Sequence, residues 1–154
     1  MKIYLLTHPR EVNKKTNTGV LVSEVLAENC HLFIWDRVNP NPDLLARIAC
    51  ESVALLYPCE DSETATINEH FDSIIILDGT WQEAQKMYNR SAYLKPLKKV
   101  KIAPDQESIY SLRRNQKPSG LCTAECASEI LKINGHVSQA EQLHMKLAAF
   151  VTGK

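Results

Sequence analysis

The chain has 154 residues, with 18 basic and 18 acidic side chains and a formal net charge of zero. This length suits one domain, residues 1–154, with a substantial core, and the charge balance excludes polyanion binding through net charge alone. No apolar run reaches about 18 residues, so no membrane-spanning helix is predicted, and the run at residues 3–6 is too short for a secretory signal. Five cysteines without a regular framework lead us to expect a reduced, cytoplasmic protein.

Strands and helices alternate along the sequence. Short apolar runs predict strands at residues 3–7, 31–35, 53–57, 73–77 and 97–102. Helical spacing predicts a helix capped by Asn17 or Thr18, helices at 44–50, 80–88 and 123–134 with Gly135 after the last, and a final helix capped by Ser138. This alternation predicts an α/β fold with a mainly parallel sheet and helices on both faces.

Two polar segments have little periodicity. Residues 60–69 are acidic, which predicts a surface connection or a short helix. Residues 104–120 are polar and long for a connection within a compact domain, which is typical of a functional or mobile loop.

The sequence from Ser73 to Ala84 joins the most apolar strand to a helix. Its isoleucine-rich first half ends at Asp78-Gly79-Thr80-Trp81. A polar cluster where a buried parallel strand meets a helix is the usual ligand position in open α/β sheets. Asp78 is therefore the leading candidate for a chemical role, although Asp78 or Thr80 serving only as a helix N-cap is an equal alternative.

Several other chemistries find no support in the sequence. Cys122 and Cys126 share one helix face, but no second pair completes a zinc site, so we expect buried structural thiols. The five histidines form no His-Glu-x-x-His motif, and neither a glycine-rich phosphate loop nor a Gly-x-Ser-x-Gly elbow occurs. We therefore expect no metal.

Three polar loops, at residues 8–19, 78–81 and 111–125, remain. In a parallel sheet such loops can converge at one edge. Basic runs at residues 95–101 and 113–117 are either solvated faces or a local surface for nucleic acid.

The motifs in these loops resemble the DTW-domain family. Asp78-Gly79-Thr80-Trp81 is similar to its Asp-x-Thr-Trp signature. The accompanying motifs, in matching order, are His8–Glu11, Asn17–Gly19, Leu112–Arg114 and Leu121–Glu125. The resemblance covers essentially the whole chain; Cys126 stands where the family often has alanine.

The resemblance implies a SPOUT-like fold with a C-terminal trefoil knot. It also implies a tRNA-uridine aminocarboxypropyltransferase, which moves the 3-amino-3-carboxypropyl group of S-adenosylmethionine to uridine N3 and releases 5′-methylthioadenosine. The expected partner is tRNA, and no membrane association is expected. The protein itself is expected to be a monomer or a homodimer.

The expected site follows from the matched motifs and from the chemistry. The catalytic candidates are Asp78, Thr80 and Trp81. The expected cofactor contacts are Thr18, Leu77, Gly120, Leu121, Cys122, Thr123 and Arg113. The expected RNA contacts are Arg10, Lys14, Lys15, Lys98, Lys99, Lys101 and Arg114.

Some roles within this set stay open. Asp78 either takes the N3 proton as a base or faces the sulfonium, and Trp81 either stacks on a base or belongs to the core. Arg113 or Arg114 grips the methionine carboxylate or an RNA phosphate. Two alternative functions are a methyltransferase of the same fold and a non-catalytic RNA-binding module.

Overall fold

The structure, a computed structural model, describes residues 1–58, 63–64, 71–102 and 122–152. Its strands form one sheet in the order β2-β1-β5-β3-β6-β4, in which every pair is parallel. The strands are β1 Lys2–Thr7, β2 Cys30–Ile34, β3 Val53–Leu56, β4 Glu63–Thr64, β5 Ser73–Asp78 and β6 Lys98–Lys101. The predicted α/β fold with a parallel sheet is thus confirmed.

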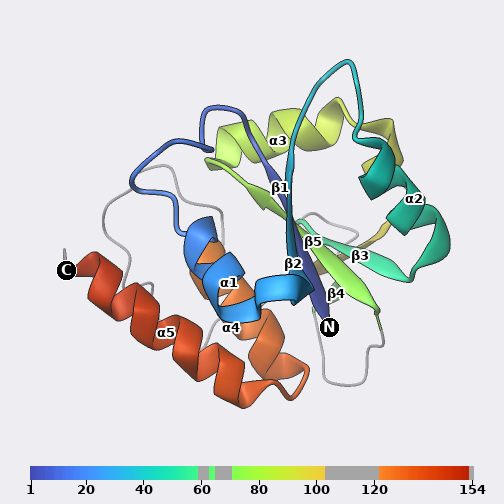
Figure 1. Ribbon diagram of the computed structural model, residues 1–154. Helices are drawn as coiled ribbons and strands as arrows, with labels where there is room; N and C mark the ends of the chain where they lie inside the picture. Colours follow the sequence, from blue (N-terminus) through green and yellow to red (C-terminus); the bar gives the residue numbers. More distant parts are fainter. Residues whose placement is uncertain (59–62, 65–70, 103–121, 153–154) are drawn as a thin grey trace.

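Helices cover both faces of the sheet, as predicted. They are α1 Gly19–Leu26, α2 Pro42–Cys50, α3 Trp81–Asn89, α4 Thr123–Ile133 and α5 Val137–Val151, with 3-10 turns at Ala27–Asn29 and Ala92–Leu94. Helices α1, α4 and α5 pack on one face, and α2 and α3 pack on the other (Figure 1).

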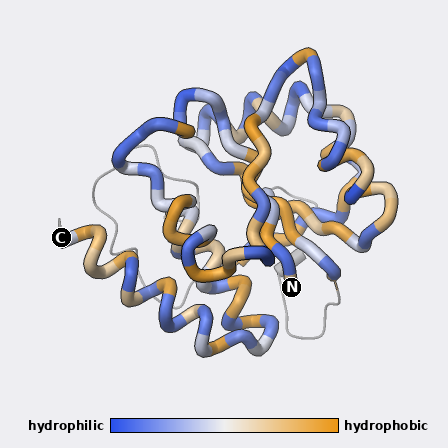
Figure 2. The backbone as a smooth tube through the Cα atoms, viewed as in Figure 1, coloured by the Kyte–Doolittle hydropathy of each residue, from blue (hydrophilic) through white to orange (hydrophobic). Residues whose placement is uncertain are grey.

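The central strand β5 is buried on both faces. Ile74 and Ile76 of β5 belong to the core under α1, α4 and α5, whereas Ile75 and Leu77 belong to the core under α2 and α3. Because successive side chains of a strand point to opposite faces, a strand in this position needs a continuous apolar run. Figure 2 shows the central strands as largely hydrophobic and the loop from β1 to α1 as largely hydrophilic.

The end of α4 and the start of α5 test two sequence predictions. Gly135 has a φ of 85° and follows α4, as expected for a helix-ending glycine. However, α5 begins at Val137, its N-cap is His136, and no side chain caps it. Ser138 is therefore inside the helix, and its predicted role as the cap is wrong.

The acidic segment contains a short strand. Residues Glu63–Thr64 form β4, which pairs with β6, so the predicted surface connection or short helix is wrong at these two positions. The rest of that segment lies outside the described residues. The trefoil knot stays a prediction, because residues 103–121 between β6 and α4 also lie outside them.

The described helices and cysteines bear on two further predictions. Among the residues that the structure describes, no helix combines the length and the apolar character needed to cross a membrane. Cysteines 30, 50, 122 and 126 are free thiols. Of these, Cys122 and Cys126 are buried, as expected for structural thiols.

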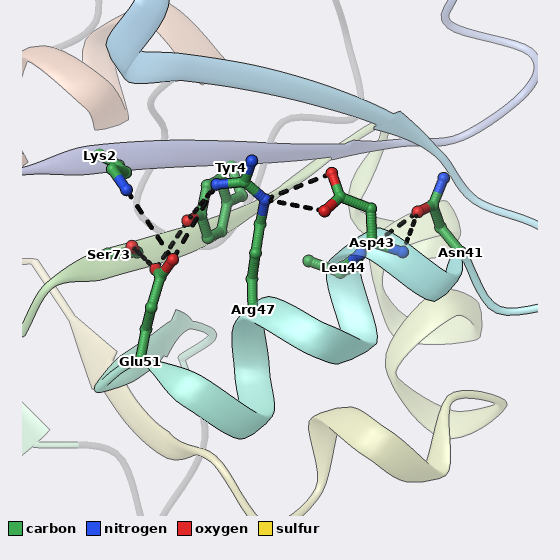
Figure 3. A network of polar contacts seen from close by, with 8 residues as sticks. All are labelled: Lys2, Tyr4, Asn41, Asp43, Leu44, Arg47, Glu51 and Ser73. Atoms are coloured by element: carbon green, nitrogen blue, oxygen red, sulfur yellow. Dashed lines mark hydrogen bonds and ion pairs between the residues drawn. The ribbon is translucent and has the colours of Figure 1, made fainter.

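A polar network holds the end of α2 against the amino ends of the central strands (Figure 3). The Glu51 carboxylate accepts hydrogen bonds from the Tyr4 hydroxyl at 2.7 Å and the Ser73 hydroxyl at 2.6 Å. Lys2 and Arg47 lie 3.8 and 3.9 Å from its second oxygen. Burial alone raises the pKa of Glu51, but the two hydrogen bonds and the two cations outweigh it, so the pKa lies below its ordinary value of 4.5.

We expect Glu51→Gln to lower the free energy of unfolding by about 1–2 kcal/mol at pH 7. A depressed pKa in the folded state means that ionised Glu51 stabilises the fold above pH 4.5, and that this contribution is lost as pH falls through the lower folded value. Urea unfolding of both proteins at pH 7 and pH 3 should therefore show a difference that shrinks in acid. Asp43→Asn is the matched control, because the Asp43 side chain is 61% exposed and its ion pair with Arg47 contributes little. An equal difference at both pH values would contradict the role of the Glu51 charge.

Candidate active site

Asp78 ends the central strand β5 at the carboxyl edge of the sheet, beside Thr7 at the end of β1. Its Oδ2 accepts hydrogen bonds from the Thr7 hydroxyl at 3.2 Å and from the Asn17 side-chain amide at 2.9 Å. Its Oδ1 accepts one from the Thr123 hydroxyl at 2.9 Å. We call these four residues the Asp78 cluster. It joins β1, the loop before α1, β5 and the start of α4, and Asp78 itself is 1% exposed.

The Asp78 cluster holds a negative charge with neutral donors. Two hydroxyls and one amide contact the carboxylate, and no cation forms an ion pair with Asp78 within the described ranges. A hydrogen bond to an ionised group contributes roughly 1.5–3 kcal/mol. The arrangement therefore fixes the carboxylate in place, and within the described ranges no cation offsets its negative potential at the sheet edge.

Thr80, rather than Asp78, caps α3. The Thr80 hydroxyl accepts from the Glu83 backbone N–H at 3.2 Å, and the Glu83 carboxylate accepts from the Thr80 N–H at 2.9 Å. This reciprocal pair is a capping box. The alternative in which Asp78 is present only as a helix cap is therefore not what the structure shows.

Gly19, the first residue of α1, makes room for the Asp78 cluster. The Asn17 side-chain oxygen accepts from the Gly19 N–H at 2.6 Å, while its amide also donates to the Glu11 carbonyl at 3.2 Å. A β-carbon on Gly19 would lie 2.8 Å from the Asn17 Oδ1 and 2.9 Å from the Asp78 Oδ2. Any other residue at position 19 would displace the two groups that define the cluster.

The starts of α1 and α4 are linked directly. The Ala124 N–H donates to the Thr18 hydroxyl at 3.0 Å, which satisfies a free donor in the first turn of α4. Cys122 caps α4, and its N–H donates to the Glu125 carboxylate at 3.1 Å. Burial raises the pKa of the Cys122 thiol to about 12, so it stays protonated at neutral pH. Thr18, Cys122 and Thr123, all predicted cofactor contacts, thus lie together.

Two other predicted site residues pack on the opposite face of the sheet. Trp81 packs against the core under α2 and α3, with its ring 5.5 Å from that of Tyr57. Leu77 is a fully buried member of the same core. Their side chains therefore do not join the Asp78 cluster, and the partly buried Trp81 has at least the core role considered for it.

His8 supports the first turn of the loop after β1. Its N–H donates to the Asp78 carbonyl at 3.0 Å, and its Nδ1 accepts from the Arg10 N–H at 3.1 Å. Its ring stacks on Trp35 at 5.8 Å. Burial lowers the pKa of His8, with the Glu83 carboxylate 3.6 Å away acting in the opposite direction. Because its pKa lies below the ordinary value of 6.5, His8 is neutral at pH 7. Its contacts position the loop.

The predicted RNA contacts lie in two regions. Arg10 and Lys15 are exposed in the loop before α1, whereas Lys14 donates to the fully buried Glu11 at 2.9 Å. On β6, Lys98 lies over the Phe71 ring and Lys99 over the Tyr88 ring, on opposite faces of the sheet.

Lys101 completes the basic run of β6 and is exposed at the end of the strand. By strand alternation it shares a face with Lys99, so the basic run is divided between two faces. Arg113, Arg114, Gly120 and Leu121 lie outside the described residues.

Sequence reasoning missed two members of the site. Thr7 pairs with Asp78 in register, which apolar patterns do not specify when both strands are buried on both faces. Asn17 is predicted as a possible helix cap and as part of a matched motif, but not as a partner of Asp78. Its position in a motif beside a glycine was the available signal for a second role.

Metal ligands are not grouped in the part of the chain that the structure describes. There, no three His, Cys, Asp or Glu side chains lie close enough to hold an ion. Carboxylates, hydroxyls and backbone amides make up the polar content of the site.

The chain is similar in sequence to curated tRNA-modifying transferases. The chain is 27% identical over 139 residues to tRNA-uridine aminocarboxypropyltransferase 2 of Macaca fascicularis, covering 85% of this chain and 47% of that protein. It is also 27% identical over 139 residues to the Drosophila melanogaster protein of the same name, covering 86% and 55%. The chain spans about half the length of the curated relatives it matches.

The fold is similar to that of a solved transferase. The SAM-dependent rRNA:acp-transferase Tsr3 from Vulcanisaeta distributa superposes with a TM-score of 0.62 over 99% of this chain and 76% of that chain, at 12% identity. At this identity the likeness concerns the fold alone. The sequence profile of the DTW domain matches residues 1–153, and the chain therefore belongs to the DTW-domain family.

Proposed function

We propose that this protein transfers the 3-amino-3-carboxypropyl group of S-adenosylmethionine to N3 of a tRNA uridine and releases 5′-methylthioadenosine. Family membership and the names of the curated relatives support a tRNA-modifying transferase. The observation that carries the proposal is the convergence of Thr18, Asp78 and Thr123, from three separate motifs, at the carboxyl edge of a parallel sheet. Ligands of open α/β sheets bind at this edge.

The Asp78 cluster fits a cationic co-substrate. Among the described residues, neutral donors alone fix its carboxylate, so a sulfonium nearby would be attracted by its negative charge. Thr18, Cys122 and Thr123 lie beside this carboxylate and would hold the rest of the molecule. S-adenosylmethionine supplies an electrophilic carbon next to its sulfonium. Selecting the γ-carbon rather than the methyl is a matter of positioning.

The burial of Asp78 favours the electrostatic role over the role of base. A general base must come within hydrogen-bond reach of the proton that it takes, whereas both oxygens of Asp78 already accept hydrogen bonds and the residue is 1% exposed. We therefore propose that Asp78 positions the start of α4 and provides a fixed negative charge. Arg10 and Lys15, exposed at the same edge, are proposed to meet the tRNA.

Product analysis tests the proposed function. We expect purified protein, S-adenosylmethionine and unmodified tRNA to yield a uridine carrying the four-carbon amino acid fragment, with 5′-methylthioadenosine formed in equal amount. Mass spectrometry of nucleosides from the digested tRNA measures the first product, and chromatography measures the second. A methylated uridine with S-adenosylhomocysteine would show a methyltransferase instead, and tRNA binding without either product would show a non-catalytic module.

A further inference from the structure

A concave surface lies beside the Asp78 cluster, at the β2 edge of the sheet. It is a groove of about 420 Å³ between the loop after β1, the start of α1 and β2. Thr7 and Asn17, which both donate to Asp78, form part of its lining. We call it the β2 groove. It lies on the side of Asp78 toward β1 and β2, away from β3 and β6.

The walls of the β2 groove are apolar side chains left open to solvent. Val12 is 37% exposed, Val20 50% and Leu32 47%. A grouped set of exposed aliphatic residues in a concave site is typical of a binding surface. An occupant that covered these three side chains would remove their apolar surface from water.

The rim of the β2 groove is polar and positive. Lys14 is neutralised by the buried Glu11 at 2.9 Å, but Lys15 has no ion pair within the described residues, and Asn13 has no hydrogen-bond partner there. An occupant with a flat apolar body, a hydrogen-bonding edge and a negative charge matches all three features. A nucleotide has this combination.

We infer that the β2 groove binds an unpaired nucleobase of the tRNA strand next to the target uridine, with its phosphate against Lys15. Proteins read single-stranded RNA by contacting the faces and edges of splayed bases, and the shared Thr7 and Asn17 put this groove beside the Asp78 cluster. This inference rests on the proposed function, because it takes tRNA as the substrate. The inference adds a contact between the protein and a tRNA nucleotide next to the reacting uridine.

Two variants separate the base from the phosphate. Lys15→Ala should weaken binding of unmodified tRNA a few-fold and reduce the slope of log K against log salt by about one, because one phosphate contact is lost. Val20→Ala combined with Leu32→Ala should weaken binding by roughly three- to tenfold at unchanged salt slope, because only apolar contact is removed. Both residues are half exposed, so folding should survive. Fluorescence anisotropy with labelled tRNA measures both effects.

Matched controls come from a second groove, about 460 Å³, between α4 and α5. Val137→Ala combined with Met145→Ala removes two exposed apolar side chains there. Lys146→Ala, outside that groove, removes a lysine of α5 that is 48% exposed and pairs with the similarly exposed Glu24 at 3.7 Å. We expect both controls to bind tRNA as the unmodified protein does. We also expect all variants to bind S-adenosylmethionine with unchanged affinity in calorimetry.

The outcomes distinguish this inference from the proposed function. Unchanged tRNA affinity and salt slope in both β2-groove variants would overturn the nucleobase site even if the protein transfers the group to tRNA. Loss of S-adenosylmethionine binding in the Val20/Leu32 variant would also overturn it and assign the groove to the co-substrate. If the binding effects appear but no product forms, the RNA site stands and the proposed activity fails.

Discussion

Replacing Asp78 with alanine should lower the free energy of unfolding by about 3–5 kcal/mol. The change leaves the Thr7, Asn17 and Thr123 donors without their buried acceptor, and each stranded donor costs roughly 1–3 kcal/mol, less what rotation of the hydroxyls recovers. In a chain of this length such a loss corresponds to a fall in melting temperature of about 10 °C or more. Urea unfolding and calorimetry measure the two quantities.

Asp36→Ala is the control for this prediction. Asp36 also accepts two hydrogen bonds, from the N–H groups of Val38 and Asn39 at 2.8 and 3.0 Å, but it is exposed. Water replaces the lost acceptor there, so the free energy of unfolding should change by less than about 1 kcal/mol. Equal effects at the two positions would show that Asp78 does not organise the sheet edge.

Replacing Asp78 with asparagine should lower kcat/KM for transfer by about 10²- to 10³-fold, the usual size of losing one oriented electrostatic group at a reaction centre. Asparagine preserves the shape of the side chain and removes its charge. Because the sulfonium is already positive when bound, an electrostatic role predicts that part of the loss appears as weaker binding of S-adenosylmethionine. Steady-state kinetics with unmodified tRNA, together with calorimetry, separate the two parts.

Thr7→Val is the matched variant, because it removes one donor to Asp78 and leaves the charge. We expect it to lose about 1 kcal/mol of stability and to retain most of its transfer activity. Near-normal kcat/KM in a folded Asp78→Asn protein would remove it from the reaction.

The elements of the fold were predictable because their causes are local. The apolar run of β5 and the glycine after α4 both act through neighbouring residues. The cap of α5 was mispredicted because a serine near a helix start is a common signal, yet the helix begins one residue before Ser138. Local sequence rules depend on spacings of a few residues, so they give the position of a helix end only approximately.

The site was predictable in part. The place of Asp78 followed from the strand that precedes it, but its partners Thr7, Asn17 and Thr123 lie 71, 61 and 45 residues away in the chain. Pairing register and helix docking decide such contacts, and a strand buried on both faces gives no sign of which face a residue takes. Strand alternation does place Leu77 on the face opposite Asp78, but nothing in the sequence shows that Trp81, at the start of the next helix, packs on that same face.

The separations within the Asp78 cluster also bear on how the chain folds. Its hydrogen bonds close loops of 45 to 71 residues, so they can form only after β1 has aligned with β5 and the C-terminal helix α4 has docked. We expect contacts that form so late to be absent from the folding transition state. They would then act on the unfolding rate far more than on the folding rate. We therefore expect the buried carboxylate that organises the proposed reaction centre also to prolong the lifetime of the folded chain.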